Sequence, residues 1–122
     1  KDNGKQRAEA LIVRSELQED AEKQLADLNQ AVETDPTNAA TWQARAGYYI
    51  ARGQMEDAAK DFEKLLENDP KNIAVRQALT EALLNLEKYD LALAQVNKAI
   101  ELQPDYSLSY TLRAQVYEAQ EK

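Results

Sequence analysis

Apolar residues recur along this chain at the i, i+3, i+4, i+7 spacing of helices that bury one face. The pattern is clearest between Trp42 and Pro70, where it predicts two helices joined by a tight turn at Gly53. The return helix should run from about Met55 to Asn68. The buried faces of the pair are expected to consist of Trp42, Ala46 and Tyr49 on the first helix and Ala58, Phe62, Leu65 and Leu66 on the second.

A repeat of 34 residues predicts further copies of this helix pair. Asp35-Pro36, Asp69-Pro70 and Gln103-Pro104 recur at that interval, and each proline ends a pair because it lacks an N–H and disfavours helix at the residue before it. Asn38 and Asn72 are placed to cap the next helices. The third pair carries its apolar faces on Leu79, Leu83, Ala92, Val96 and Ala99, with a return helix from about Tyr89 to Leu102, and Glu87 stands where the second pair has Gly53.

The two ends of the chain are less regular. Apolar stripes predict two helices in the first part, through Ala8, Leu11, Ile12 and Ser15 and then through Leu25, Leu28, Ala31 and Val32. Residues 18–20 between them hold neither Gly nor Pro, so a single bent helix from Lys5 to Thr34 is an alternative. A last helix, Ser107 to about Glu121, carries a stripe of Tyr110, Ala114 and Tyr117 that should face a return helix absent from this chain.

These elements predict an all-α chain of seven helices, arranged as three antiparallel pairs and a terminal single helix. We expect one domain over residues 1–122, with repeats at about 5–38, 39–72 and 73–106 and the terminal helix at 107–121. One hairpin cannot bury its apolar face alone, so neighbouring pairs should stack and share a core. The chain begins KDNGK, without Met or an apolar signal core, and we interpret it as a fragment of a longer protein.

Composition argues against several functional classes. The formal charge of -7 disfavours nucleic-acid binding, which needs a clustered basic surface. No apolar run reaches the roughly 18 residues of a membrane span, so we expect a soluble chain. The sequence does not decide its compartment, and cytoplasm and periplasm both stay open. The chain has no His and no Cys, which removes the commonest general base, metal-binding nitrogen and thiol nucleophile. The glycines are isolated and form no phosphate loop. We therefore predict no enzyme activity, no cofactor and no metal site.

The second copy resembles the tetratricopeptide repeat family. It matches the family pattern at Trp42, Tyr49, Ala58, Phe62 and Pro70, with Ala46 in place of a small Gly. The third copy matches at Leu79, Ala92, Ala99 and Pro104, with Arg76 in place of the Trp. The first copy departs most, because Gln24 occupies a small-residue position and its first helix has no aromatic residue. The resemblance implies a right-handed α-solenoid whose first helices line a concave groove for peptide segments.

The resemblance assigns that groove to the exposed face of each first helix. Its predicted lining is Ala40, Gln43, Gly47, Ile50, Ala74, Gln77, Glu81, Leu84, Thr111 and Gln115. Relatives that grip the acidic C-terminal tails of chaperones use basic residues where this chain has Glu9, Val13, Gln43, Gly47, Gln77 and Glu81. We therefore predict a scaffold that binds a neutral or basic peptide segment rather than a carboxylate-terminated one, with Gln43 and Gln77 exposed as hydrogen-bonding groups.

Other interpretations remain open at this point. A structural spacer or self-association module would use the stripe at Tyr110 and Tyr117 as its contact. RNA binding is disfavoured by acidic residues on the predicted groove, namely Glu9, Glu16, Glu81 and Glu118. Arg45 and Arg113 recur at equivalent positions, and we expect each to pair with a neighbouring carboxylate. Tyr48 is placed to fill the seam between repeats.

Overall fold

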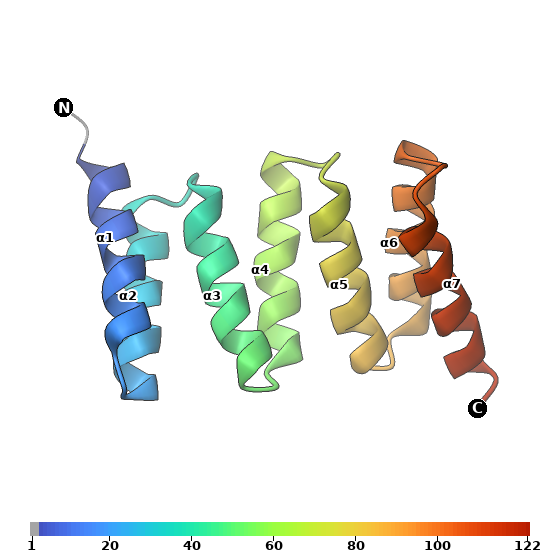
Figure 1. Ribbon diagram of the computed structural model, residues 1–122, viewed down its shortest axis with the longest axis horizontal. Coiled ribbons are helices and arrows are strands. Elements are labelled where there is room, and N and C mark those ends of the chain that lie inside the picture. The colour runs from blue at the N-terminus through green and yellow to red at the C-terminus, as the bar shows by residue number, and fades with distance from the viewer. Residues whose placement is uncertain (1–2) are drawn as a thin grey trace. The chain divides into compact units, whose positions relative to one another are not determined.

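Seven α-helices occur in residues 3–122, the part of the chain that the computed structural model describes, and that part contains no strand (Figure 1). The predicted all-α fold and its seven helices are confirmed. The helices are α1 (Gly4–Leu17), α2 (Ala21–Thr34), α3 (Ala39–Ala51), α4 (Met55–Asn68), α5 (Ile73–Asn85), α6 (Tyr89–Leu102) and α7 (Ser107–Gln120). None of these helices is both long and apolar enough to cross a membrane.

Side-chain caps start three of these helices. Asp20 accepts hydrogen bonds from the backbone N–H groups of Glu22 at 2.8 Å and Lys23 at 3.4 Å. Asn38 and Asn72 cap α3 and α5 as predicted, each accepting from a backbone N–H of the first turn, at 3.0 and 3.1 Å. Asp20 has an extended backbone directly before α2, so the chain breaks at this point. The alternative of one bent helix is therefore wrong, because an aspartate cap ends the continuity without Gly or Pro.

Two equivalent turns use the left-handed backbone conformation. Gly53, after α3, has φ of 73°, and Glu87, after α5, has φ of 60°. Glycine adopts this conformation freely, whereas the Cβ of another residue crowds the backbone there. The repeat therefore imposes one turn geometry at two positions, and only the first has the residue that suits it.

The described helices form two compact units, one reaching to Gly53 and the other starting at Gln54. In the first unit α1 and α2 pack as an antiparallel pair, and α3 packs against both (Figure 1). Its buried apolar residues are Ala8, Leu28, Ala31, Val32, Trp42 and Ala46. Leu11, Ile12, Leu25 and Tyr49 are only half-buried.

In the second unit α5 packs against α4, α6 and α7, and α6 packs against α7. Its buried apolar residues include those predicted: Ala58, Phe62, Leu65, Leu66, Leu79, Leu83, Ala92, Val96 and Ala99, joined by Leu112 and Val116 of α7. The stripe of Tyr110, Ala114 and Tyr117 on α7 is exposed. Tyr110 and Tyr117 are 40% and 48% exposed, and Ala114 between them is also exposed.

Candidate functional site

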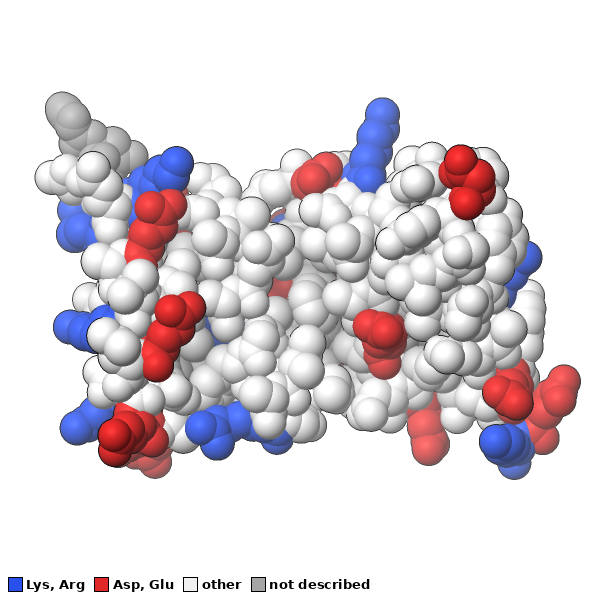
Figure 2. Space-filling model, in the orientation of Figure 1, with Lys and Arg blue, Asp and Glu red and all other residues white. Residues whose placement is uncertain are grey.

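The face of α3 that was assigned to a binding groove is open. Ala40, Gln43, Gly47 and Ile50 are all exposed. A Cβ added to Gly47 would meet no atom within 4 Å, so another chain can approach the backbone at this point. Figure 2 shows mostly uncharged side chains over α3 on the face drawn, and both acidic and basic side chains around α1. The surface of α3 thus offers small and amide-bearing side chains with one aliphatic residue.

The corresponding residues of the second unit differ in exposure. Ala74 and Glu81 of α5 are exposed, as are Thr111 and Gln115 of α7, and Leu84 is half-buried. Gln77 was predicted to be exposed and is not: only 8% of it is accessible, and its amide nitrogen Nε2 is buried without a hydrogen-bond partner. The helical repeat gives the direction of a side chain, but not how closely neighbouring helices approach it. Gln77 is therefore a poor candidate for direct contact with a peptide.

Three arginines on the first helices of pairs turn toward second helices. Arg45 donates to Asn29 Oδ1 of α2 at 2.9 Å, and Arg113 donates to Asn97 Oδ1 of α6 at 3.1 Å. The partner of Arg113 is thus an amide rather than the expected carboxylate. Both guanidinium groups also lie over the aromatic ring three residues earlier, Arg45 at 5.2 Å and Arg113 at 5.4 Å from the ring centre.

Arg76 completes the set by donating to Gln95 Oε1 of α6 at 2.8 Å. These contacts hold the cations of α3, α5 and α7 away from the predicted groove residues on the same helices.

An ion pair ties α1 to α2. Arg14 Nη2 donates to Asp27 Oδ1 at 2.7 Å and Arg14 Nε donates to Oδ2 at 3.1 Å, while Gln18 donates to Oδ2 at 3.3 Å. These hydrogen bonds, led by those from Arg14, hold the pKa of Asp27 below its ordinary value against the opposing effect of burial. The same pairing raises the pKa of Arg14. The carboxylate of Asp27 is buried and its partner is largely exposed.

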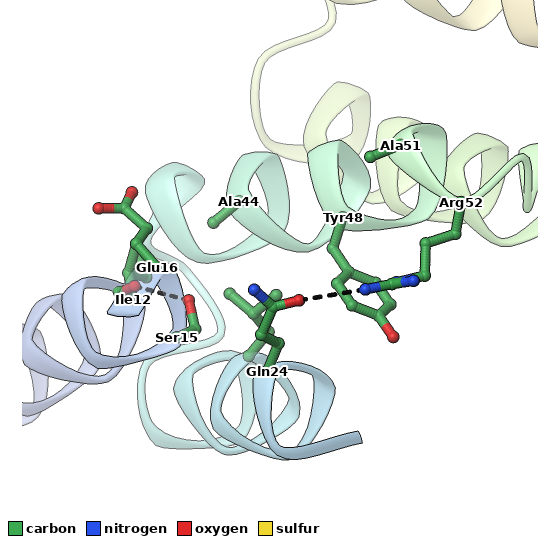
Figure 3. A pocket seen from close by; sticks show the side chains of 9 residues that line it. Ile12, Ser15, Glu16, Gln24, Ala44, Tyr48, Ala51 and Arg52 are labelled. Carbon is green, nitrogen blue, oxygen red and sulfur yellow. Dashed lines mark hydrogen bonds between the residues drawn. The ribbon is translucent and has the colours of Figure 1, made fainter. Parts of the chain in front are cut away.

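A cavity of about 260 Å³ lies between α1, α2 and α3 (Figure 3). Its lining residues are Ile12, Ser15, Glu16, Gln24, Leu28, Ala44, Tyr48, Ala51 and Arg52. Tyr48 fills part of the seam between the first helix pair and α3, as expected, and its hydroxyl donates to the backbone oxygen of Ala21 at 3.1 Å. The guanidinium of Arg52 lies 5.0 Å from the centre of the Tyr48 ring.

This cavity was not predicted from the sequence, although the signal was present. Gln24 and Ser15 are the first copy's departures from the repeat, at positions where the second copy has Ala58 and Tyr49. Ser15 is smaller than Tyr49, the residue at the equivalent position of the second copy. Its hydroxyl donates to the backbone oxygen of Ile12 at 2.6 Å. No cluster of three or more Asp, Glu, His or Cys residues suited to a metal ion occurs in residues 3–122.

Comparison with protein families gives a match to the tetratricopeptide repeat at residues 49–116, more than half of the chain. Among curated proteins, the chain is similar to a TPR repeat-containing protein of Methanocaldococcus jannaschii, at 36% identity over 63 residues. That match covers 52% of this chain and 11% of the relative. The chain thus spans about a tenth of the length of that curated protein.

Solved structures of tetratricopeptide domains share the fold along nearly the whole chain. The first TPR of Spaghetti (RPAP3), bound to an HSP90 peptide, matches with a TM-score of 0.79 at 16% identity over 97% of this chain and 96% of that one. The second TPR domain of human RPAP3, in complex with an HSP70 peptide, matches with a TM-score of 0.75 at 17% identity, covering 93% and 95%. The TPR domain of Arabidopsis OM64 matches with a TM-score of 0.69 at 19% identity, covering 94% and 92%. The all-α fold is thus that of a helical-repeat solenoid.

Proposed function

This chain belongs to the tetratricopeptide repeat family, and we propose that it is a non-catalytic interaction module that binds a peptide segment of a partner protein. The observation that carries the proposal is the open face of α3. Ala40, Gln43, Gly47 and Ile50 present small, uncharged surface where the family lines its groove. Two structures of the same fold hold peptides, from HSP90 and HSP70, which supports the assignment of a peptide ligand.

The proposed partner segment is neutral or basic and does not depend on a terminal carboxylate. Glu9 and Glu81 are exposed on first helices, where a basic clamp would be needed. Arg45, Arg76 and Arg113 are engaged with side chains of second helices. An acidic tail would therefore meet negative charge and no free guanidinium at the predicted groove positions of α3, α5 and α7.

A pull-down from lysate of the source organism tests the function, using a matched pair of variants. The groove variant carries Gln43→Arg and Glu81→Arg. The control carries Ala26→Arg and Glu63→Arg, which make the same change in net charge at exposed positions of second helices. We expect a protein that is captured by the native chain and by the control but lost with the groove variant. Capture that is equal for all three chains would overturn binding at this face.

The class of partner is tested separately, by titrating a labelled peptide of sequence SRMEEVD, the HSP90 segment bound in the similar structure. We expect no saturable change in fluorescence anisotropy, because the carboxylates have no basic clamp to meet. Saturable binding that is weakened by the groove variant would leave the function in place and overturn the proposed preference for neutral or basic segments.

Self-association is a second candidate, favoured by the exposure of Tyr110 and Tyr117 on one face of α7. Sedimentation equilibrium over a range of protein concentrations tests it. If the apparent mass rises with concentration in the native chain and not in a Tyr110→Lys, Tyr117→Lys variant, that face is the contact between copies. A constant monomer mass excludes it.

A further inference from the structure

We propose that the cavity between α1, α2 and α3 is an anchor site in peptide binding. It accepts one aliphatic side chain of the partner, and Glu16 at its rim pairs with a lysine or arginine beside that side chain. The inference rests on the proposed function and adds the position and chemistry of one contact. Three features carry it: the size of the cavity, the origin of the space, and the charge at the rim.

The size suits a side chain better than a free small molecule. The volume of about 260 Å³ lies below the range of roughly 300–1,000 Å³ that is typical of sites for drug-sized ligands. Ile12, Leu28, Ala44 and Ala51 contribute apolar walls. Contact between such walls and an aliphatic group is favourable, whereas a polar group would be buried there without a hydrogen-bond partner from the apolar side chains.

The first unit has small residues at two cavity-lining positions where the second unit has leucine. In the second unit the positions 68 residues after Ser15 and Ala44, two repeats later, are Leu83 and Leu112. Both leucines are buried in the core of that unit, at 4% and 2% exposure. The first unit lacks both leucines, so its seam stays open.

The polar groups within the cavity are already satisfied by the protein. The hydroxyl of Ser15 donates to the backbone oxygen of Ile12 at 2.6 Å. Gln24 Nε2 donates to the backbone oxygen of Gln18 at 2.9 Å. The hydroxyl of Tyr48 donates to the backbone oxygen of Ala21. What the cavity offers to a guest is therefore mainly its apolar wall.

Two charged residues stand at opposite sides of the cavity in Figure 3, Glu16 on α1 and Arg52 after α3. Arg52 is engaged with the wall, since its guanidinium lies over the ring of Tyr48 and donates to Gln24 Oε1 at 3.5 Å. Glu16 is exposed and forms no ion pair with any residue of 3–122. The charge left for a ligand at this rim is negative, so the complementary residue is a cation.

Exposed apolar residues continue from the cavity along α1. Val13 and Leu17, each next in sequence to a lining residue, are 56% and 78% exposed. Glu9 lies two helical turns before Glu16 and is also exposed. A segment that alternates aliphatic and basic side chains would meet both kinds of surface along this helix.

The test selects peptides from a random phage-displayed library on the immobilised native chain and measures the affinity of the best one by fluorescence anisotropy. We expect the enriched peptides to share an aliphatic residue next to Lys or Arg. Ala44→Phe and Ala51→Phe fill the cavity and should each weaken binding about tenfold or more, since the anchor loses its burial. Ala26→Phe, at an exposed position of α2 outside the cavity, should leave the affinity unchanged.

A separate variant tests the role of the negative charge of Glu16 at the rim. Glu16→Lys should weaken the same basic peptide about fivefold, and a new selection on that variant should no longer enrich Lys or Arg. If circular dichroism shows that Ala44→Phe does not fold, the test of the anchor site rests on Ala51→Phe. Ala51 is exposed, so a larger side chain there should leave the fold intact. Failure to enrich any peptide would count against the proposed function itself. Peptides that bind the native chain and the folded Phe variants equally well would overturn the anchor site and leave the function standing.

Discussion

The indole Nε1 of Trp42 donates a hydrogen bond of 2.7 Å to the backbone oxygen of Pro36, six residues earlier. The contact recurs at the two equivalent places. Arg76 donates to the oxygen of Pro70 from Nη2 at 2.7 Å and from Nε at 3.1 Å. The hydroxyl of Tyr110 donates to the oxygen of Pro104 at 2.7 Å. An indole, a guanidinium and a phenol thus satisfy the same carbonyl group, so this position of the repeat requires a hydrogen-bond donor rather than a ring.

Replacing Arg76 tests that requirement. Arg76→Leu removes the donor and should lower the free energy of unfolding by about 1.5 kcal/mol, since hydrogen bonds to charged groups contribute about 1.5–3 kcal/mol. Arg76→Trp introduces the donor of the preceding repeat and should stay closer to the native chain. Urea denaturation followed by circular dichroism measures both. Equal losses in the two variants would mean that the donor is not what stabilises this turn.

Phe62 is the aromatic residue of α4, and it is only 7% exposed. Phe62→Ala should lower the free energy of unfolding by about 3–5 kcal/mol, because the lost transfer energy is increased by the cavity that remains. Lys60→Ala, at an exposed position of the same helix, should stay within about 0.5 kcal/mol of the native chain. Thermal and urea denaturation of the three proteins measure the difference. A Phe62→Ala variant as stable as its Lys60→Ala control would show that Phe62 is not part of the core.

The turns at Gly53 and Glu87 predict opposite effects of two substitutions. Glu87→Gly relieves a left-handed conformation, with φ of 60°, and should raise the free energy of unfolding by up to about 1 kcal/mol. Gly53→Ala forces the same conformation on alanine at φ of 73° and should lower it by about 1 kcal/mol. A Cβ at Gly53 would meet no atom within 4 Å, so the loss would come from the backbone alone. Stabilities that change in the same direction would contradict the shared turn geometry.

The sequence predicted helices better than it predicted contacts between them. The proline interval and the asparagine caps located α3 to α7, because helix ends depend on local backbone chemistry. Asp20 is a cap of the same kind, but the sequence did not decide whether the helix breaks at residues 18–20. An aspartate within a charged stretch has several possible roles. The capping bonds from Glu22 and Lys23 identify the role it has.

The candidate site could be predicted only in outline. The spacing of α3 gave the exposed positions Gln43 and Gly47 correctly, since one helix face needs only the helical period. The same period placed Gln77 on the surface, where it is buried. The cavity beside Ser15 depends on how three helices approach one another, and a side chain missing from a seam has no local signature in the sequence.

Acid should weaken the first helix pair through Asp27. The carboxyl group has an ordinary pKa of about 3.9 in an unfolded chain, and the hydrogen bonds from Arg14 lower it in the folded protein. Its contribution to stability is therefore fully present above about pH 4 and is lost as the pH falls through the lower folded value. We expect the native chain to lose more stability than an Asp27→Asn variant between about pH 5 and pH 2, measured by urea denaturation at each pH.

A surface pair provides the control for this effect. Glu101 accepts from Lys98 at 2.7 Å, a hydrogen bond that also lowers its pKa, but both side chains are largely exposed. Salt screens such a pair more strongly than a buried one. The difference between the native chain and Glu101→Gln should therefore shrink at about 1 M salt, where the Debye length is roughly 3 Å, while the difference for Asp27→Asn persists. If Asp27→Asn loses stability with acid as steeply as the native chain, the ion pair with Arg14 does not stabilise the fold.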